Sequence, residues 1–206
     1  MKPLLKFGCT LLLLLLLLPL LACEKPAGMT QLRPNDIILA FGDSLTSGTG
    51  ADPTTSYPEQ LGKLIGRRVV NAGVPGEVSA EGARRLPGLL DTHKPRLLLL
   101  LHGGNDLLQK RGEAELKDNL RRMHEAAHQR GIDVVMIAVP RPGLLPGDAP
   151  LYKELATELN IPLLEDALTQ LLKNNGYKSD AVHLNAAGYD VLARNIADFL
   201  KQLGAI

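Results

Sequence analysis

Short apolar runs alternate with amphipathic stretches along most of this chain, and this alternation restricts the possible fold more than any other feature. Ile37–Phe41, Leu97–Leu101 and Val134–Val139 are continuous apolar runs of the kind found in strands that are buried on both faces. Between the runs lie stretches with helical periodicity. A chain in which strands and helices alternate is expected to form a mostly parallel sheet with helices on both faces, a three-layer α/β/α sandwich.

The same reading gives the remaining elements. Further short strands are predicted at Val69–Val70 and Pro162–Leu164. Helices are predicted at Tyr57–Ile65, Ala80–Leu90, Ala114–Gln129, Leu151–Leu159, Asp166–Lys173 and Ala186–Leu203. The second helix is expected to be interrupted at Pro87, because proline lacks the N–H that a helix interior needs. The third has the clearest apolar stripe, formed by Leu116, Leu120, Met123 and Ala127.

The N-terminus has a different composition from the rest of the chain. Lys2 and Lys6 give it a basic start, and Leu11–Leu18 is an unbroken apolar run. From Phe7 to Ala22 there are only 16 residues, fewer than the roughly 20 apolar residues of a membrane-spanning helix. Residues 1–22 are therefore predicted to be a secretory signal peptide, with an uncleaved membrane anchor as the alternative.

A cysteine follows this segment in a characteristic context. Leu20–Cys23 resembles a bacterial lipobox, in which the cysteine thiol is lipidated and the cysteine becomes the new N-terminus. Cys9, the other cysteine, lies inside the signal, so Cys23 would have no disulfide partner. We expect a lipid anchor on Cys23, a tether over residues 23–34 and one domain over 35–206. An ordinary cleavage site followed by a chance cysteine is the alternative.

The expected location follows from this anchor. Acyl chains would hold the protein on a membrane of the bacterial cell envelope, facing the periplasm. Glu24 after the cysteine indicates the outer membrane, by a rule known for enteric bacteria. From Cys23 onward the chain has 21 basic and 22 acidic side chains, a net charge of −1, and it has no tryptophan. This composition argues against a nucleic-acid partner.

Four short blocks carry the residues with chemical potential: Gly42–Leu45, Asn71–Gly73, Gly103–Asp106 and Asp180–His183. The first three each follow a predicted strand. Since the carboxyl ends of parallel strands meet at one edge of the sheet, these blocks are expected to converge there. Each block alone has a simple structural explanation as a turn or a helix cap, but the four together, in this order, indicate catalysis.

The residue types in these blocks suit acyl transfer. Ser44 is the candidate nucleophile, His183 the base that removes its proton, and Asp180 the acid that orients the imidazole. The candidate oxyanion donors are the backbone N–H groups of Ser44 and Gly73 and the side-chain amide of Asn105. This chemistry requires neither a metal nor another cofactor.

On these blocks the chain resembles the SGNH (GDSL) hydrolases, over about Ile37 to Leu203. Ser44, Gly73, Asn105 and His183 match the four residues that name the family. The resemblance is greatest to the bacterial arylesterases, acyl thioesterases and lysophospholipases. It implies a flavodoxin-like α/β/α fold and hydrolysis of acyl esters or thioesters without metal, with a small ester or a lipid as substrate.

Two positions depart from the family pattern. Pro75 follows the second block and is expected to stiffen the loop beside the acyl site. His102 precedes the third block, where an apolar residue is common; it is either a hydrogen-bonded core histidine or a substrate contact.

Two other functions remain open from the sequence. One is a carbohydrate or peptidoglycan O-deacetylase of the same superfamily, which would have a polar, open cleft. The other is a lipoprotein that binds a ligand without catalysis. Apolar residues in loops near the site favour acyl chains instead: Val74, Val78, Leu107, Leu108, Leu144 and Leu145.

Overall fold

A five-stranded parallel sheet forms the centre of the protein. The computed structural model describes residues 29–143 and 147–206, so the predicted signal peptide and lipidation site lie outside the described residues. The strand order is β2-β1-β3-β4-β5, and each neighbouring pair is parallel. The strands are β1 (Ile38–Gly42), β2 (Val69–Gly73), β3 (Leu97–Leu101), β4 (Asp133–Ile137) and β5 (Leu163–Leu164).

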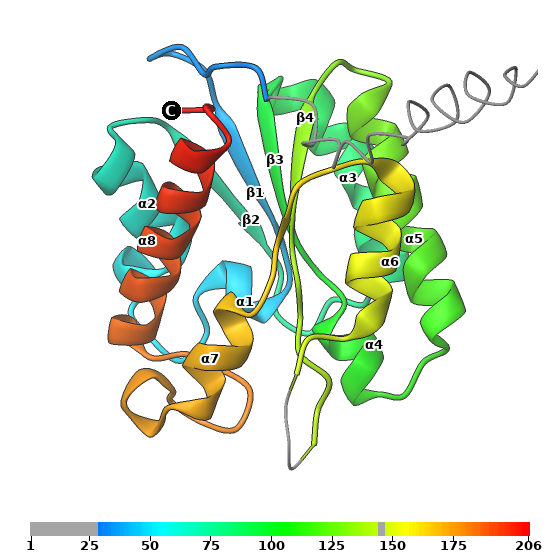
Figure 1. Cartoon of the computed structure of the whole chain (residues 1–206), viewed down its shortest axis with the longest axis vertical. Coiled ribbons are helices and arrows are strands. Elements are labelled where there is room, and N and C mark those ends of the chain that lie inside the picture. Colours follow the sequence, from blue (N-terminus) through cyan, green and yellow to red (C-terminus); the bar gives the residue numbers. More distant parts are fainter. Residues whose placement is uncertain (1–28, 144–146) are drawn as a thin grey trace, which may run out of the picture.

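Helices cover both faces of this sheet, as Figure 1 shows, so the fold is the expected three-layer α/β/α sandwich. On one face α2 (Tyr57–Ile65) packs against α8 (Ala186–Gln202), with α7 (Ala167–Lys173) beside α8. On the other face α5 (Glu113–His128) lies between α3 (Ser79–His93) and α6 (Pro150–Leu159). None of the helices in the described ranges is long and apolar enough to cross a membrane.

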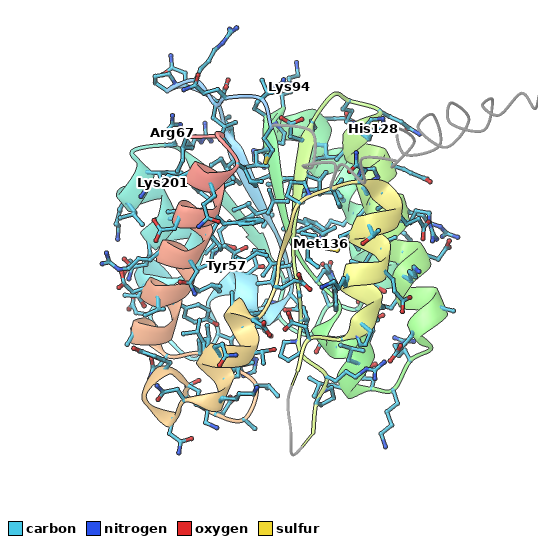
Figure 2. All side chains as sticks on the ribbon, in the orientation of Figure 1. Tyr57, Arg67, Lys94, His128, Met136 and Lys201 are labelled. Carbon is cyan, nitrogen blue, oxygen red and sulfur yellow. The ribbon has the colours of Figure 1, made fainter. Side chains whose placement is uncertain are left out.

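The core follows from the apolar runs. Every residue of β1 and β3 is buried, because helices cover the sheet on both sides. The predicted stripe of α5 also faces inward, with Leu120 and Met123 fully buried. In Figure 2 the labelled Tyr57 and Met136 lie in the interior, whereas Lys94 and Lys201 lie at the periphery. The burial of these apolar side chains is the main stabilising contribution.

The prediction that Pro87 interrupts its helix is wrong. α3 runs without a break from Ser79 to His93, with Pro87 inside it. A proline within a helix costs about 3 kcal/mol, chiefly through one lost hydrogen bond and a clash with the preceding turn. Leu86 and Leu90, on either side of it, are buried in the core. Their burial, at about 1.5–3 kcal/mol each, is sufficient to keep the helix continuous.

The strand register places the functional blocks at one edge of the sheet. Gly42, the last residue of β1, pairs with Gly73 of β2 and with Leu101 of β3. The carboxyl ends of these three strands are therefore level. Two short helices that were not predicted begin just beyond this edge, α1 (Ser44–Ser47) after β1 and α4 (Gly104–Leu108) after β3.

Candidate functional site

Ser44 is the first residue of α1, directly after the turn that leaves β1. Gly42 is required in this turn because a Cβ there would overlap the carbonyl oxygen of Leu101 on the neighbouring strand. Asp43 caps the helix by accepting a hydrogen bond from the Leu45 N–H at 3.2 Å. Burial raises the pKa of Asp43, although hydrogen bonds from Leu45 and Gly104 oppose this shift. The cap fixes the serine at the carboxyl edge of the sheet.

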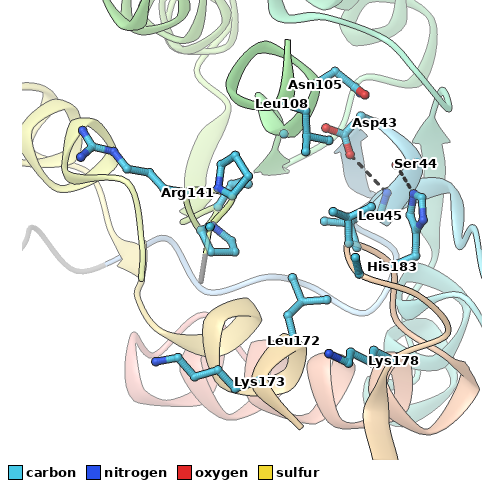
Figure 3. A pocket seen from close by; sticks show the side chains of 17 residues that line it. Asp43, Ser44, Leu45, Asn105, Leu108, Arg141, Leu172, Lys173, Lys178 and His183 are labelled. Carbon is cyan, nitrogen blue, oxygen red and sulfur yellow. Dashed lines mark hydrogen bonds between the residues drawn. The ribbon is translucent and has the colours of Figure 1, made fainter. Parts of the chain in front are cut away.

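His183 and Asp180 reach Ser44 from the loop that precedes α8. The His183 Nε2 atom lies 3.0 Å from the Ser44 Oγ atom, and the His183 Nδ1 atom lies 2.8 Å from the Asp180 Oδ2 atom. Ser44 and His183 are 139 residues apart in the chain. The structure thus brings the three side chains of the predicted triad into one hydrogen-bonded row, of which Figure 3 shows Ser44 and His183 beside the pocket.

The other carboxylate oxygen of Asp180 holds the loop in shape. Asp180 Oδ1 accepts hydrogen bonds from the backbone N–H groups of Val182 and His183, both at 2.8 Å. Burial acts to raise the pKa of Asp180, but the hydrogen bonds from His183 and Val182 outweigh it and lower the pKa below its ordinary value of 3.8. The carboxylate therefore stays ionised at neutral pH and can stabilise a positively charged imidazole.

Asn105 belongs to α4 and lines the same pocket as Ser44. Its amide nitrogen donates a hydrogen bond to the carbonyl oxygen of Glu77 at 2.9 Å. An amide group carries two N–H donors, and the bond to Glu77 engages one of them. The second donor is available for an oxyanion in the pocket, so the geometry is compatible with the predicted role of Asn105.

The geometry does not support Gly73 as an oxyanion donor. The Gly73 N–H donates to the Asn71 side-chain oxygen at 3.0 Å, and Gly73 does not line the described part of the pocket. Glycine is needed there for another reason, because a Cβ would overlap the backbone of α1 at Thr46 and Ser47. The sequence singled out Gly73, and the structure explains the need for glycine there by the close approach of β2 to α1.

Gly76, which the sequence analysis did not single out, has a backbone N–H that is not engaged by an acceptor among the described residues, unlike that of Gly73. A turn closed by the hydrogen bond from the Glu77 N–H to the Val74 oxygen places Gly76 at a φ of 80°, in the left-handed region. The next residue, Glu77, binds Asn105. The Pro75–Gly76 pair was the available signal, since it is typical of such a turn.

His102 is a core residue and not a substrate contact. Its side chain is fully buried, and its Nε2 atom lies 3.1 Å from a carboxylate oxygen of Glu77. Pro75, the other departure from the family pattern, is exposed and does not line the described pocket. Neither residue therefore contacts the space beside Ser44.

A pocket of about 440 Å³ opens beside Ser44 and His183. The apolar part of its lining comes from loops and helices spread along the chain: Leu45, Leu108, Val139, Pro140, Pro142, Leu172, Ala181 and Val182. Of the apolar loop residues that the sequence placed near the site, Leu108 lines the described pocket. Val78 and Leu107 are buried, Val74 is exposed, and residues 144–145 lie outside the described ranges.

Comparison with known proteins agrees with this architecture. The model of the GDSL-like lipase/acylhydrolase family matches residues 40–191. The esterase TesA of Pseudomonas aeruginosa is 30% identical over 98% of this chain and 100% of its own length. The thioesterase 1/protease 1/lysophospholipase L1 of Escherichia coli is 29% identical over 82% of this chain and 85% of its own.

Solved structures give the same result. The crystal structure of TesA superposes with a TM-score of 0.74 at 28% identity, covering 82% of this chain and 99% of that one. AlinE4, an SGNH-hydrolase family esterase, superposes with a TM-score of 0.65 at 29% identity, covering 84% and 98%. The chain therefore belongs to the GDSL-like lipase/acylhydrolase family and is a serine hydrolase of ester or thioester bonds.

Proposed function

We propose that Ser44, His183 and Asp180 form the catalytic triad of this hydrolase. The observation that carries the proposal is the hydrogen-bonded row from the Asp180 carboxylate through His183 to the Ser44 hydroxyl, with distances of 2.8 and 3.0 Å. A serine hydroxyl is a weak nucleophile until a base within hydrogen-bond reach removes its proton. His183 is in that position, and Asp180 holds its ring in the required orientation.

The reaction then proceeds in two halves. In the first, Ser44 Oγ attacks the acyl carbonyl while His183 Nε2 accepts its proton; the tetrahedral intermediate collapses, and the protonated His183 gives that proton to the departing alcohol or thiol. In the second, His183 takes a proton from water, the resulting hydroxide attacks the acyl-serine, and the free acid leaves as Ser44 recovers its proton.

The oxyanion that forms in each half needs hydrogen-bond donors. We assign this role to the backbone N–H of Ser44, the amide of Asn105 and, in place of Gly73, the backbone N–H of Gly76. Such donors are effective because they are already oriented before the charge develops.

The pocket supports acyl chains as the substrate class. Eight of the 17 residues that line it have apolar side chains, with Leu108 on one side and Leu172 on the other. A deacetylase of sugars would need a cleft rich in polar groups that hydrogen-bond hydroxyls. We therefore propose fatty acyl esters or thioesters as substrates, and we place the acyl chain along this apolar wall.

The mouth of the pocket supports a substrate with an anionic polar part. Lys173 and Lys178 both line the pocket, and neither forms an ion pair with another described residue. Arg141, a third cation in the lining, is paired with Glu113 at 2.8 Å. A phosphate-bearing substrate such as a lysophospholipid would bring a negative charge to the two lysines. The Escherichia coli relative carries the name lysophospholipase among its names.

Replacement of the nucleophile tests the triad. Ser44→Ala should reduce turnover of a p-nitrophenyl acyl ester by on the order of 10⁶, as loss of the triad serine does in other hydrolases. The melting temperature should stay close to that of the wild type, since the change removes one partly exposed hydroxyl. Retention of more than about a tenth of the activity would eliminate Ser44 as the nucleophile.

A substrate panel tests the substrate class. Acyl esters of graded chain length should show kcat/KM increasing with length, whereas acetylated sugars should react poorly. Lysophosphatidylglycerol should be hydrolysed faster than the monoacylglycerol with the same acyl chain, and this preference should shrink at high salt. A preference for acetyl groups on sugars would support the deacetylase instead.

We further propose that the protein is a lipoprotein anchored through Cys23 and facing the periplasm. Leu20–Cys23 and the apolar run before it support this location. An anchored esterase would act on lipids at the membrane face. Cys23→Ser should release the enzyme from the membrane fraction while leaving its specific activity unchanged. Mass spectrometry that finds an unprocessed Met1 on the native protein would overturn the proposal.

A further inference from the structure

The side chains of Glu77, Arg85 and His102 form a hydrogen-bonded cluster next to Asn105, and the catalytic steps above do not use it. The Glu77 side chain is only 6% exposed. Its carboxylate accepts two hydrogen bonds from Arg85, at 2.8 Å from Nε and 2.7 Å from Nη2. A third contact comes from His102 Nε2 at 3.1 Å. The cluster joins the loop after β2, helix α3 and the end of β3.

Arg85 is itself held by the end of the sheet. Its Nη2 atom also donates to the carbonyl oxygen of Ala72 at 3.1 Å. Its guanidinium carbon lies 4.4 Å from the centroid of the Phe41 ring, an arrangement that favours a cation. The guanidinium thus connects α3 to both β1 and β2, and its bidentate grip fixes the plane of the Glu77 carboxylate.

His102 is the third member of the cluster. Its Nδ1 atom is buried and has no hydrogen-bond partner among the described residues, whereas its Nε2 atom faces the Glu77 carboxylate. Gly82 of α3 makes room for this ring, because a Cβ at that position would meet Nε2. The His102 carbonyl accepts a hydrogen bond from the Tyr152 hydroxyl at 2.8 Å. His102, directly after β3, is therefore held by hydrogen bonds at both its backbone carbonyl and its side chain.

The Glu77 carboxylate remains charged in this environment. Burial acts to raise its pKa, but the hydrogen bonds from Arg85 and His102 outweigh burial and lower the pKa to about 2. Buried ion pairs are often no more stabilising than an apolar replacement of the same size, because both charges lose their hydration. We therefore explain the cluster by the neighbouring groups that it orients, and not by its contribution to stability alone.

Glu77 connects this cluster to Asn105. Its backbone carbonyl accepts the hydrogen bond from the Asn105 amide at 2.9 Å. An amide side chain can rotate unless a partner fixes it, and a donor that is misplaced by about 1 Å can lose on the order of 10² in rate. The position of the Glu77 backbone thus decides where the second N–H of Asn105 points.

We propose that Glu77, clamped by Arg85 and His102, is a positioning residue that orients the Asn105 amide toward the developing oxyanion. This inference rests on the proposed triad mechanism, in which Asn105 donates to that oxyanion. The proposed action is on Asn105, a donor to the developing oxyanion, so its effect should appear in turnover and not in substrate affinity.

The neighbouring segment has an independent anchor, which makes the proposal testable in a folded enzyme. The start of α3 is held by Asp106, whose carboxylate accepts hydrogen bonds from the Ser79 N–H at 2.8 Å and the Ser79 hydroxyl at 2.6 Å. Asn119 donates to the same hydroxyl at 3.0 Å. Loss of the Glu77 carboxylate should therefore loosen the Asn105 partner without unfolding α3.

A double-mutant cycle measures the effect. Glu77→Gln keeps the shape and the backbone carbonyl but removes the charge that Arg85 clamps. In the wild-type background it should lower kcat about 10- to 100-fold and change KM less than about threefold. In the Asn105→Ala background the same change should lower kcat less than about threefold, because the group that it positions is already absent.

The outcomes separate a positioning role from a structural one. An equal loss of kcat in both backgrounds, or no loss in either, would overturn the proposal. If Glu77→Gln does not fold, Arg85→Gln is judged by the same criteria. Arg130→Gln is the matched control, since Arg130 forms a bidentate pair with Asp91 away from the pocket and should leave kcat unchanged. Failure of the triad itself would be seen separately, as activity that survives Ser44→Ala.

Discussion

Asp180→Asn tests the triad most sharply, because the structure dictates how the new amide must orient. The Asp180 Oδ1 atom accepts two backbone N–H groups at 2.8 Å, from Val182 and His183. An asparagine would keep its oxygen on these donors and turn its NH₂ group toward His183 Nδ1. The histidine would then have to accept at Nδ1 and carry its proton on Nε2, where it cannot act as a base for Ser44.

The size of the effect follows from these contacts. Turning the amide the other way would forfeit two hydrogen bonds, each contributing about 1 kcal/mol, so the unproductive orientation is favoured by roughly 30-fold. Loss of the negative charge 2.8 Å from the imidazole adds a further loss, reduced because the Asp180 side chain is 53% exposed. We expect kcat/KM to fall by about 10³, with about 10⁴ as the upper limit seen in a related substitution elsewhere.

The assay is the initial rate of p-nitrophenyl ester hydrolysis across neutral and alkaline pH. Because the defect is a misplaced proton, the loss should persist over the whole range. The melting temperature should hardly change, since the two backbone bonds remain. Asp198→Asn is the control, because Asp198 pairs with Lys201 on the surface of α8. An Asp180→Asn enzyme with more than a tenth of wild-type activity would refute the reasoning and leave Asp180 as a loop cap.

Three further predictions concern the surroundings of the triad. Asn105→Ala should lower kcat by roughly 10²–10³, the usual effect of one oxyanion donor; a rise in KM alone would identify Asn105 as a ground-state contact. Gly73→Ala should lower both the melting temperature and kcat, because the new Cβ would displace the backbone of Thr46 and Ser47 in α1; unchanged values of both would contradict this overlap. Glu77 has a folded-state pKa of about 2 against an ordinary 4.5, so its contribution to stability is present above pH 4.5 and lost as the pH falls to about 2. That contribution is about 3 kcal/mol, and acid titration of the unfolding free energy should show a steeper fall for the wild type than for Glu77→Gln.

The fold was predictable because its signals are local. Apolar runs of strand length, such as Leu97–Leu101, alternate with helical periodicity, and parallel α/β packing is the arrangement that buries both. The prediction failed at Pro87, where a local rule about a missing N–H was outweighed by the burial of Leu86 and Leu90 on α3.

The site was predictable in part, for a similar reason. Ser44 and Asn105 follow strands whose carboxyl ends share an edge, so topology alone brings them together. Gly73 shows the limit of this reasoning. It also follows a strand, but the direction of its N–H depends on Asn71, and the need for glycine depends on the proximity of α1.

The sequence by itself determined the layered fold, the order of the four blocks and the identity of the nucleophile, base and acid candidates, because each depends on residue type and short-range spacing. Only the tertiary structure decided which N–H groups are free, which apolar side chains line the pocket, and that Glu77, Arg85 and His102 meet next to Asn105. Those contacts join residues up to 28 positions apart around the clamp and 139 apart in the triad. Packing between helices and strands sets the directions of side chains that are so far apart in the chain. The pattern of residue types along the sequence does not contain this information.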